Sequence, residues 1–277
     1  MYFKFVKTKS EVLSQYLDGF YIIEKTDPGK DLKYVVFSSN RVIISLFRHA
    51  IVEVVSNTVN ISESTATPFL SVHIMAVREP LYVQYKGKIR ELALCFRPLG
   101  LNYFLNGTLK QYYRETAAPF EPFADFKEVM NLILREPDET ILLEKIEDYW
   151  LSSLQEKSFS LLENAINSLK SEEEISIQQI ADEAGISRQH LFRLFETHLC
   201  KTPSNFRKIH RFRKTLANRI DSMKRGENLT SLTYESLFYD QSHLIRDFKS
   251  FTGMSPKKFF ELNRAFDNGL INWVFPD

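Results

Sequence analysis

The last third of the chain contains two copies of one sequence pattern, 53 residues apart. Residues 191–206 read LFRLFETHLCKTPSNF, and residues 244–259 read LIRDFKSFTGMSPKKF. Both copies fit Leu-x-Arg-x-Phe, six residues, Thr or Ser followed by Pro, two residues and Phe. A stacked solenoid needs at least three repeats, so two copies indicate a small module that occurs twice.

A short helix and a turn precede the first copy. Ser176 is placed to cap a helix over 177–184, in which apolar residues recur three and four positions apart. Gly185 ends this helix, and Ser187 caps a second one. Two short helices joined by a Gly-containing turn form a helix-turn-helix. In the second copy the turn is one residue longer, and Asp240 is the expected cap.

At these residues the sequence resembles the AraC/XylS family of bacterial transcription regulators. The segment FYDQSHLIRDFKSFTGMSPKKFF, residues 238–260, is similar to the C-terminal signature of that family. The resemblance extends over about 158–262 and implies two helix-turn-helix units joined by one long helix, expected at 203–220. Thr233 and Leu237 depart from the family pattern, which usually has Ala and Gly there.

A second departure lies in the first unit, where Cys200 replaces the Gly seen at Gly253 in the second.

The second helix of each unit is the expected DNA-reading element. If both helices enter the major groove on one face of B-DNA, they lie about 34 Å apart, one helical turn. Arg and Gln can read guanine and adenine edges, and an aromatic ring can contact a thymine methyl. The predicted base contacts avoid the apolar face of each helix: Arg188, Gln189, Phe192, Arg193, Gln241, Ser242 and Arg246.

Charge is unevenly divided along the chain. The totals of 36 Lys+Arg and 35 Asp+Glu give +1, which alone argues against a nucleic-acid partner. Residues 175–260 contain 15 Lys+Arg and 8 Asp+Glu, whereas the remainder contains 21 and 27. The basic segment therefore suits DNA phosphates. The predicted phosphate contacts are Lys201, Arg207, Lys208, Arg211, Lys257 and Lys258, with Arg213, Lys214, Lys224 and Arg225 as further candidates.

The first part of the chain reads as short β-strands followed by helices. Several short strands at regular spacing predict a barrel or a sandwich. The predicted strands are 34–38, 42–47, 51–55, 69–77, 81–85 and 89–96, and the predicted helices are 99–105, 126–134, 141–154 and 159–169. The predicted fold class is α+β: a β-barrel domain with appended helices over 1–156, an all-α domain over 158–262 and a tail over 263–277.

The resemblance implies that the N-terminal domain is cupin-like and senses a ligand or mediates dimerisation. Only His49 and His73 lie in this half, without a His-x-His pair, so no metal or cofactor is expected. His73 is interpreted as a satisfied core residue. Core packing is likewise the favoured role of the aromatic residues Tyr34, Phe47, Tyr82, Tyr85 and Phe96. The helices over 126–134 and 141–154 pack onto the barrel or provide a dimer surface.

The sequence therefore predicts a DNA-binding transcription regulator rather than an enzyme, by resemblance an activator. Its expected partner is double-stranded DNA, and RNA polymerase is a further partner if the protein activates transcription. Whether it also binds a small-molecule effector or forms a homodimer is left open by the sequence. A cytoplasmic location is expected, because residues 1–9 do not have the apolar stretch of a signal peptide. No membrane partner is expected, because the apolar window 42–55 is shorter than the roughly 20 residues of a membrane-spanning helix.

Two alternatives remain. The first is a ligand- or partner-binding protein with a degenerate DNA-binding unit, suggested by Thr233 and Leu237. The second is a DNA-targeted thiol enzyme that uses Cys95, although the run Leu-Ala-Leu-Cys-Phe favours a buried, inert thiol.

Overall fold

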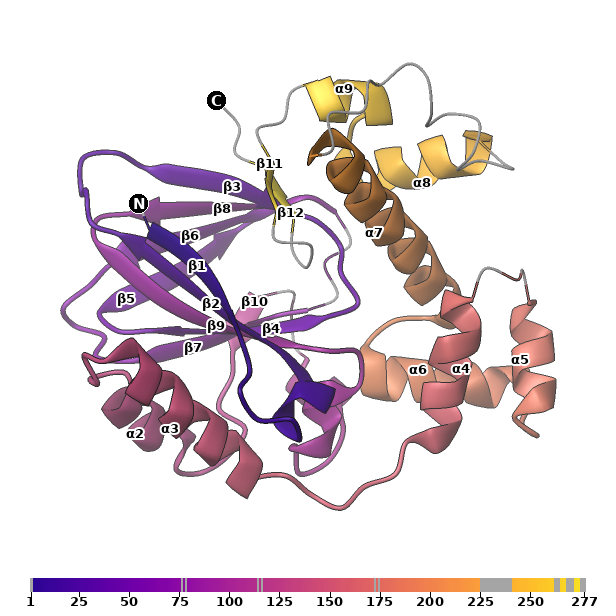
Figure 1. The fold of residues 1–277 in the computed structure, drawn as a ribbon, viewed down its shortest axis with the longest axis horizontal. Coiled ribbons are helices and arrows are strands. Elements are labelled where there is room, and N and C mark those ends of the chain that lie inside the picture. The colour runs from indigo at the N-terminus through magenta and orange to yellow at the C-terminus, as the bar shows by residue number, and fades with distance from the viewer. Residues whose placement is uncertain are drawn as a thin grey trace.

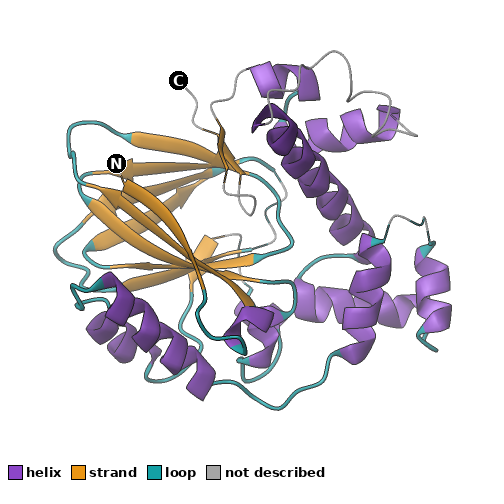
Figure 2. Ribbon diagram, in the orientation of Figure 1, coloured by secondary structure: helices purple, strands orange, loops and turns teal. Residues whose placement is uncertain are grey.

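Strands make up the first part of the chain and helices most of the second (Figures 1 and 2). The computed structural model describes residues 2–75, 77, 79–113, 115, 117–171, 173, 175–224, 241–261, 265–267 and 272–274.

Two six-stranded sheets form the N-terminal domain, so of the predicted barrel and sandwich the structure has two packed sheets and not a closed barrel. The first sheet has the order β1-β2-β9-β4-β7-β10, and the second has the order β11-β12-β3-β8-β6-β5. Only the β6–β8 pair among them is parallel. The strands are β1 (Tyr2–Lys7), β2 (Leu17–Lys25), β3 (Leu32–Val36), β4 (Val42–Phe47), β5 (Ala50–Val55), β6 (Thr58–Glu63), β7 (Leu70–Ile74), β8 (Leu81–Lys86), β9 (Ile89–Phe96), β10 (Ala117–Pro119), β11 (Ala265–Asp267) and β12 (Asn272–Val274).

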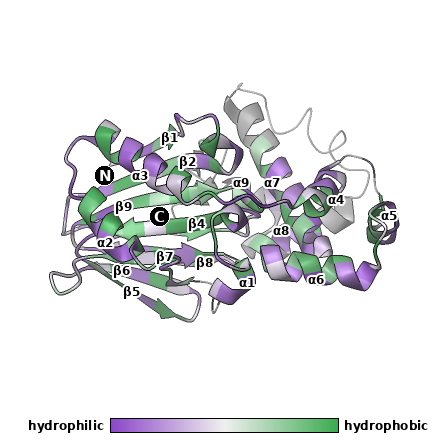
Figure 3. Ribbon diagram, turned by 90° about the horizontal axis from the view of Figure 1, so that it is seen from below, coloured by the Kyte–Doolittle hydropathy of each residue, from purple (hydrophilic) through white to green (hydrophobic). Residues whose placement is uncertain are grey.

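The first sheet is buried on both faces, which explains the nearly continuous apolar sequences of β4 and β9 (Figure 3). One face packs against the second sheet around Tyr85, Phe47 and Ala93. The other face packs against the helices α2 (Phe126–Ile133) and α3 (Glu139–Ser152). The predicted α+β class is therefore confirmed, with two facing sheets in place of a barrel.

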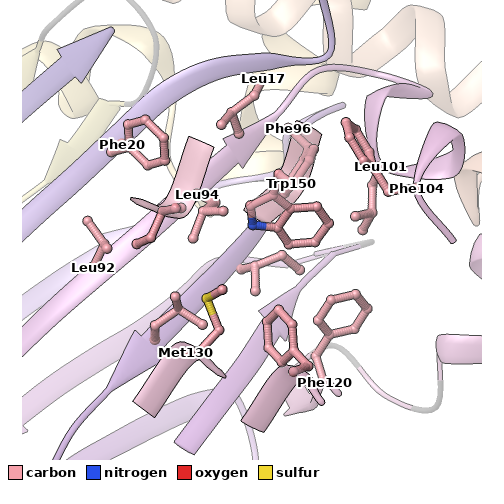
Figure 4. Close-up of a cluster of buried hydrophobic side chains, with 14 of the residues drawn as sticks. Leu17, Phe20, Leu92, Leu94, Phe96, Leu101, Phe104, Phe120, Met130 and Trp150 are labelled. Carbon is pink, nitrogen blue, oxygen red and sulfur yellow. The ribbon is translucent and has the colours of Figure 1, made fainter. Parts of the chain in front are cut away.

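Trp150 of α3 lies at the centre of the core between the first sheet and these helices (Figure 4). Its side chain is fully buried and lies edge-on to the rings of Phe96 and Phe104, with ring centroids 4.9 and 5.3 Å away. Aromatic side chains bury a large apolar area each and contribute strongly to the stability of a core. The predicted packing of α2 and α3 onto the sheet is therefore confirmed, and their role as a dimer surface stays a prediction.

Helices form most of the C-terminal part of the chain, and short helices also lie in connections between strands of the N-terminal part. These short helices are η1 (Leu13–Gln15) between β1 and β2, and η2 (Gly100–Tyr103) and α1 (Leu109–Tyr112) between β9 and β10. The C-terminal helices are α4 (Ser160–Lys170), α5 (Ile177–Glu183), α6 (Arg188–Leu199), α7 (Pro203–Lys224), α8 (Gln241–Thr252) and α9 (Pro256–Glu261).

The predicted tail contributes strands to the N-terminal domain. β12 pairs antiparallel with β11 and also with β3, through Val274 and Val35. Within the described ranges, no helix is long and apolar enough to cross a membrane.

Candidate nucleic-acid interface

The helix boundaries of the first unit follow from three local interactions. The Ser176 Oγ atom accepts a hydrogen bond from the Gln179 N–H at 3.1 Å, and the Gln179 Oε1 atom accepts from the Ser176 N–H at 2.9 Å. Gly185 ends α5 with a left-handed φ of +66°. The Ser187 Oγ atom then accepts from the His190 N–H at 3.1 Å and starts α6. Both predicted caps and the predicted turn are confirmed.

One face of α6 is buried against its neighbours. Leu191 and Phe195 have no exposed surface, and the Phe195 ring lies 5.9 Å from the Phe206 ring of α7. Ala181 of α5 is also fully buried, and its small side chain lets α5 and α6 cross closely. These contacts fix α6 in one orientation on α5 and α7.

The opposite face of α6 is polar and open. Arg188, Gln189 and Arg193 are exposed, and Phe192 is half-buried. The Arg188 guanidinium lies over the Phe192 ring, 5.4 Å from its centroid. Side chains of these types can donate to guanine, pair with adenine and contact thymine methyl groups. All four predicted base-contact residues of α6 therefore share one accessible face.

The second unit is described from α8 onward. Phe248 of α8 is fully buried, with its ring 5.2 Å from Phe212 of α7 and 5.1 Å from Phe259 of α9. Arg246 is exposed, as Arg193 is in the first unit. Thr233, Leu237 and Asp240, with the side chains of Gln241, Ser242 and Lys257, lie outside the described residues.

Cys200 and Gly253 occupy equivalent places at the ends of α6 and α8. Both have left-handed backbones, with φ of +53° and +71°. The Cys at the first position therefore adopts the conformation for which Gly is preferred.

The predicted phosphate contacts fall into two groups. Lys208, Arg211 and Lys258 are exposed, and the first two lie 3.5 and 3.8 Å from the Asp247 carboxylate of α8. Surface pairs of this kind are weak, so these cations remain accessible to a phosphate.

Arg207 and Lys201 have other surroundings. The Arg207 guanidinium donates to the carbonyl oxygen of Ile175. Lys201 is only 6% exposed, and burial lowers the pKa of its amine to about 8. Its burial disagrees with the exposed position that the sequence prediction requires.

Residues 180–261 match the family model of a helix-turn-helix domain. This match spans both copies of the repeat, α6, α7 and α8. The segment is an AraC-type helix-turn-helix domain. No curated protein sequence matches the chain at a significant level.

Some solved structures match a large part of the chain at low similarity. The 1.65 Å structure of ToxT from Vibrio cholerae is 11% identical, with a TM-score of 0.46, and the match covers 87% of this chain and 97% of that one. Unsaturated-fatty-acid-bound ToxT from strain SCE256 is 17% identical, with a TM-score of 0.41 and coverage of 87% and 92%. The AraC-like activator CuxR is 15% identical, with a TM-score of 0.16 and coverage of 65% and 68%. Similarities this low assign neither a fold nor a ligand.

The AraC-type domain is held against the N-terminal domain at the segment between β3 and β4. Arg213 of α7 donates hydrogen bonds to the carbonyl oxygens of Phe37 at 2.6 Å and Ser38 at 2.7 Å. The Asn40 amide donates to the carbonyl oxygen of Phe206 at 2.9 Å. Burial lowers the pKa of Arg213 to about 10, so its guanidinium still carries a charge at neutral pH. Sequence reasoning had placed Arg213 among the phosphate contacts.

A second contact joins α6 to η2. The Asn102 amide donates to the carbonyl oxygen of His198 at 2.9 Å. In addition, the side chain of Leu99 packs in the same apolar cluster as Leu191 and Phe195. No sequence signal indicated either docking contact, because their residues lie about a hundred or more positions apart.

The N-terminal candidates for chemistry are buried. Cys95 has no exposed surface, and burial raises the pKa of its thiol to about 12, so it is not an activated nucleophile. In the described part of the chain, no group of three His, Cys, Asp or Glu side chains is placed to hold a metal ion.

His73 is a core residue as predicted, but neither ring nitrogen has a hydrogen-bond partner among the described residues. Burial lowers the pKa of its imidazole to about 4.

Four of the five aromatic residues assigned to core packing are buried: Tyr34, Phe47, Tyr85 and Phe96. Tyr82 is 42% exposed and lies on the outer face of β8.

Proposed function

We propose that the chain is a sequence-specific transcription regulator that reads two adjacent major-groove segments of double-stranded DNA with α6 and α8. It would act in the cytoplasm, as two domains over 1–156 and 158–262. By the family resemblance it activates transcription, with RNA polymerase as a further partner. Its N-terminal domain would regulate it, through an effector or by pairing two copies.

The observation that carries this proposal is the two-sided character of α6. Leu191 and Phe195 anchor one face completely, while Arg188, Gln189 and Arg193 present donors and acceptors on the other. A helix that is fixed in this way reads bases with little further loss of conformational freedom. The match of 180–261 to the helix-turn-helix family supports the same role for α8.

The cations on α7 and α9 supply the second component of binding. Lys208, Arg211 and Lys258 would contact phosphates and would make affinity fall as salt rises. Such contacts set position on the duplex but carry no direct base information. Sequence choice would therefore depend on α6 and α8.

Fluorescence anisotropy on a DNA site selected from random sequence tests the proposal. A good bidentate Arg–guanine pair contributes about 1–3 kcal/mol of discrimination, so Arg193→Ala and Arg246→Ala should each weaken specific binding about 5- to 150-fold. The Arg135→Ala variant is the matched control, because Arg135 is exposed on the N-terminal domain. Unchanged affinity in the double variant, or equal affinity for selected and scrambled DNA, would contradict the proposal.

A further inference from the structure

A cavity opens at one end of the first sheet, on the side away from the AraC-type domain. Its volume is about 340 Å³, near the lower limit for small-molecule sites in proteins. Its walls come from the ends of β2, β4 and β9 and from Leu134 and Leu142 next to α2 and in α3. We call it the Arg48 pocket.

The inner wall of the Arg48 pocket is aliphatic. Ile22, Leu46 and Leu92 contribute side chains from three neighbouring strands, and all three are buried members of the core below Trp150. Leu134 and Leu142 close the wall on the helical side. A ligand in this space therefore needs a compact apolar body.

Several charged side chains at the mouth have partners of their own. Arg90 forms an ion pair with Glu24 at 2.9 Å, and the Lys25 amine donates to the carbonyl oxygen of Gly87 at 2.6 Å. The Glu63 carboxylate accepts from the Lys88 N–H at 2.9 Å.

Glu91 accepts a hydrogen bond from the Tyr85 hydroxyl group. Burial raises the pKa of the Glu91 carboxyl group, which weakens its competition for a nearby cation.

Arg48 differs from these residues because part of its guanidinium is both buried and unpaired among the residues that the structure describes. Its Nε atom is buried and has no hydrogen-bond partner within the described part of the chain. Its Nη2 atom lies 3.4 Å from the Nε2 atom of His49, which is a long contact. A buried guanidinium N–H is normally satisfied by an acceptor, and a carboxylate is the acceptor whose geometry suits it best.

The backbone holds Arg48 at a fixed corner between the two sheets. β4 lies in the first sheet and β5 in the second, and only Arg48 and His49 connect them. His49 has a left-handed φ of +54°, and its carbonyl oxygen accepts from the Ser64 N–H at 2.7 Å. The donor is therefore positioned before any ligand arrives.

We propose that the Arg48 pocket binds a small monocarboxylate with a compact aliphatic body, its carboxylate accepting from the Arg48 guanidinium. At about 30 Å³ per water, the space corresponds to roughly eleven waters, enough for a ligand of about ten non-hydrogen atoms. As an effector site this inference rests on the proposed regulation through the N-terminal domain. β4 runs from the pocket to the segment at Phe37–Arg41 that contacts α7.

Isothermal titration calorimetry of the full chain without DNA tests the site. The probe is cyclohexanecarboxylate, its neutral isostere is cyclohexanecarboxamide, and inorganic phosphate tests for a bare anion site. We expect one saturable site for the carboxylate at millimolar concentration and at least tenfold weaker binding of the amide and of phosphate. The proposal would be overturned if the amide or phosphate bound as tightly as the carboxylate, or if carboxylate binding did not saturate.

Two variants locate the binding. Arg48→Met keeps an apolar stem but removes the donors, and it should weaken carboxylate binding at least tenfold. Arg135→Met is the matched control and should bind as the unmodified chain does. Unchanged affinity in a folded Arg48→Met would overturn the assignment; if that variant does not fold, the acid–amide comparison decides on the unmodified protein. Because no DNA is present, failure here leaves the DNA-binding proposal intact.

Discussion

Replacing Phe37 in the N-terminal domain by Ala should destabilise the DNA-binding part of the chain. Phe37 is 1% exposed, and its ring lies 5.3 Å from Phe259 of α9 and 6.4 Å from Phe212 of α7. It belongs to the same apolar cluster as Phe248 of α8. A residue from one domain thus completes the core of the other.

The magnitude follows from the size of the buried ring. Truncating a buried Phe to Ala costs about 3–5 kcal/mol, because transfer energy is lost and a cavity is left. The hydrogen bonds from Arg213 use the carbonyl oxygens of Phe37 and Ser38 and are not removed by the substitution. A loss of 3 kcal/mol raises the open population of the affected helices by about 100-fold.

Hydrogen–deuterium exchange of peptides from α8 and α9 measures this population. In Phe37→Ala we expect their exchange to be about 100-fold faster, while β2 and β9 change little. Phe126→Ala is the matched control, because Phe126 is equally buried but packs against α3 and the first sheet. The reasoning is refuted if α8 and α9 exchange as in the unmodified chain, or if both variants affect them equally.

Three further predictions concern stability and reactivity. Gly253→Ala should lower the free energy of unfolding by about 1 kcal/mol, because a side chain is strained at the φ of +71°. Steric clash is no part of this loss, since no atom lies within 4 Å of the added methyl group. An unchanged denaturation midpoint would contradict the prediction. The pKa of His73 is about 4 in the folded chain and about 6.5 in the unfolded chain. Between these values the unfolded chain binds a proton that the folded chain does not, so the free energy of unfolding should fall by about 3 kcal/mol as pH falls from 6.5 to 4. Urea denaturation should show that His73→Leu lacks this part of the pH dependence, and equal pH profiles would refute it. Cys95 should react with a thiol reagent only as fast as the chain unfolds, so rapid labelling of the native protein would revive the thiol-enzyme alternative.

The helix-turn-helix could be predicted from the sequence because its signals are local. Ser176, Gly185 and Ser187 lie within a few residues of the groups that they cap, and the observed helices begin and end as they indicate. The strands β4 and β9 were also predicted with their observed bounds, since each is a nearly continuous apolar run.

Among the other strands, β2 and β6 were not predicted. β2 contains Asp18 and Gly19, which suggest a turn; in the structure the register shifts between Leu17 and Gly19, and β1 passes too close for a side chain at Gly19. β6 reads Thr-Val-Asn-Ile-Ser-Glu, in which buried apolar residues alternate with polar ones, so this alternation could have predicted the strand.

The docking of the two domains was beyond local reasoning. Asn is a residue type that is common in turns, and Arg is one that is common in phosphate contacts. In the structure, however, the side chains of Asn40 and Arg213 each donate to a carbonyl oxygen more than 160 residues away. The Arg48 pocket likewise depends on the meeting of β2, β4, β9 and α3, which no spacing in the sequence specifies.

Footprinting of the selected DNA site tests the central claim most directly. If α6 and α8 both read the major groove, guanine-methylation protection should appear in two segments centred about 10–10.5 base pairs apart on one face of the duplex. Arg193→Ala should remove protection in one segment, and Arg246→Ala in the other. A single protected segment that responds to both variants, or protection without sequence preference, would contradict the account.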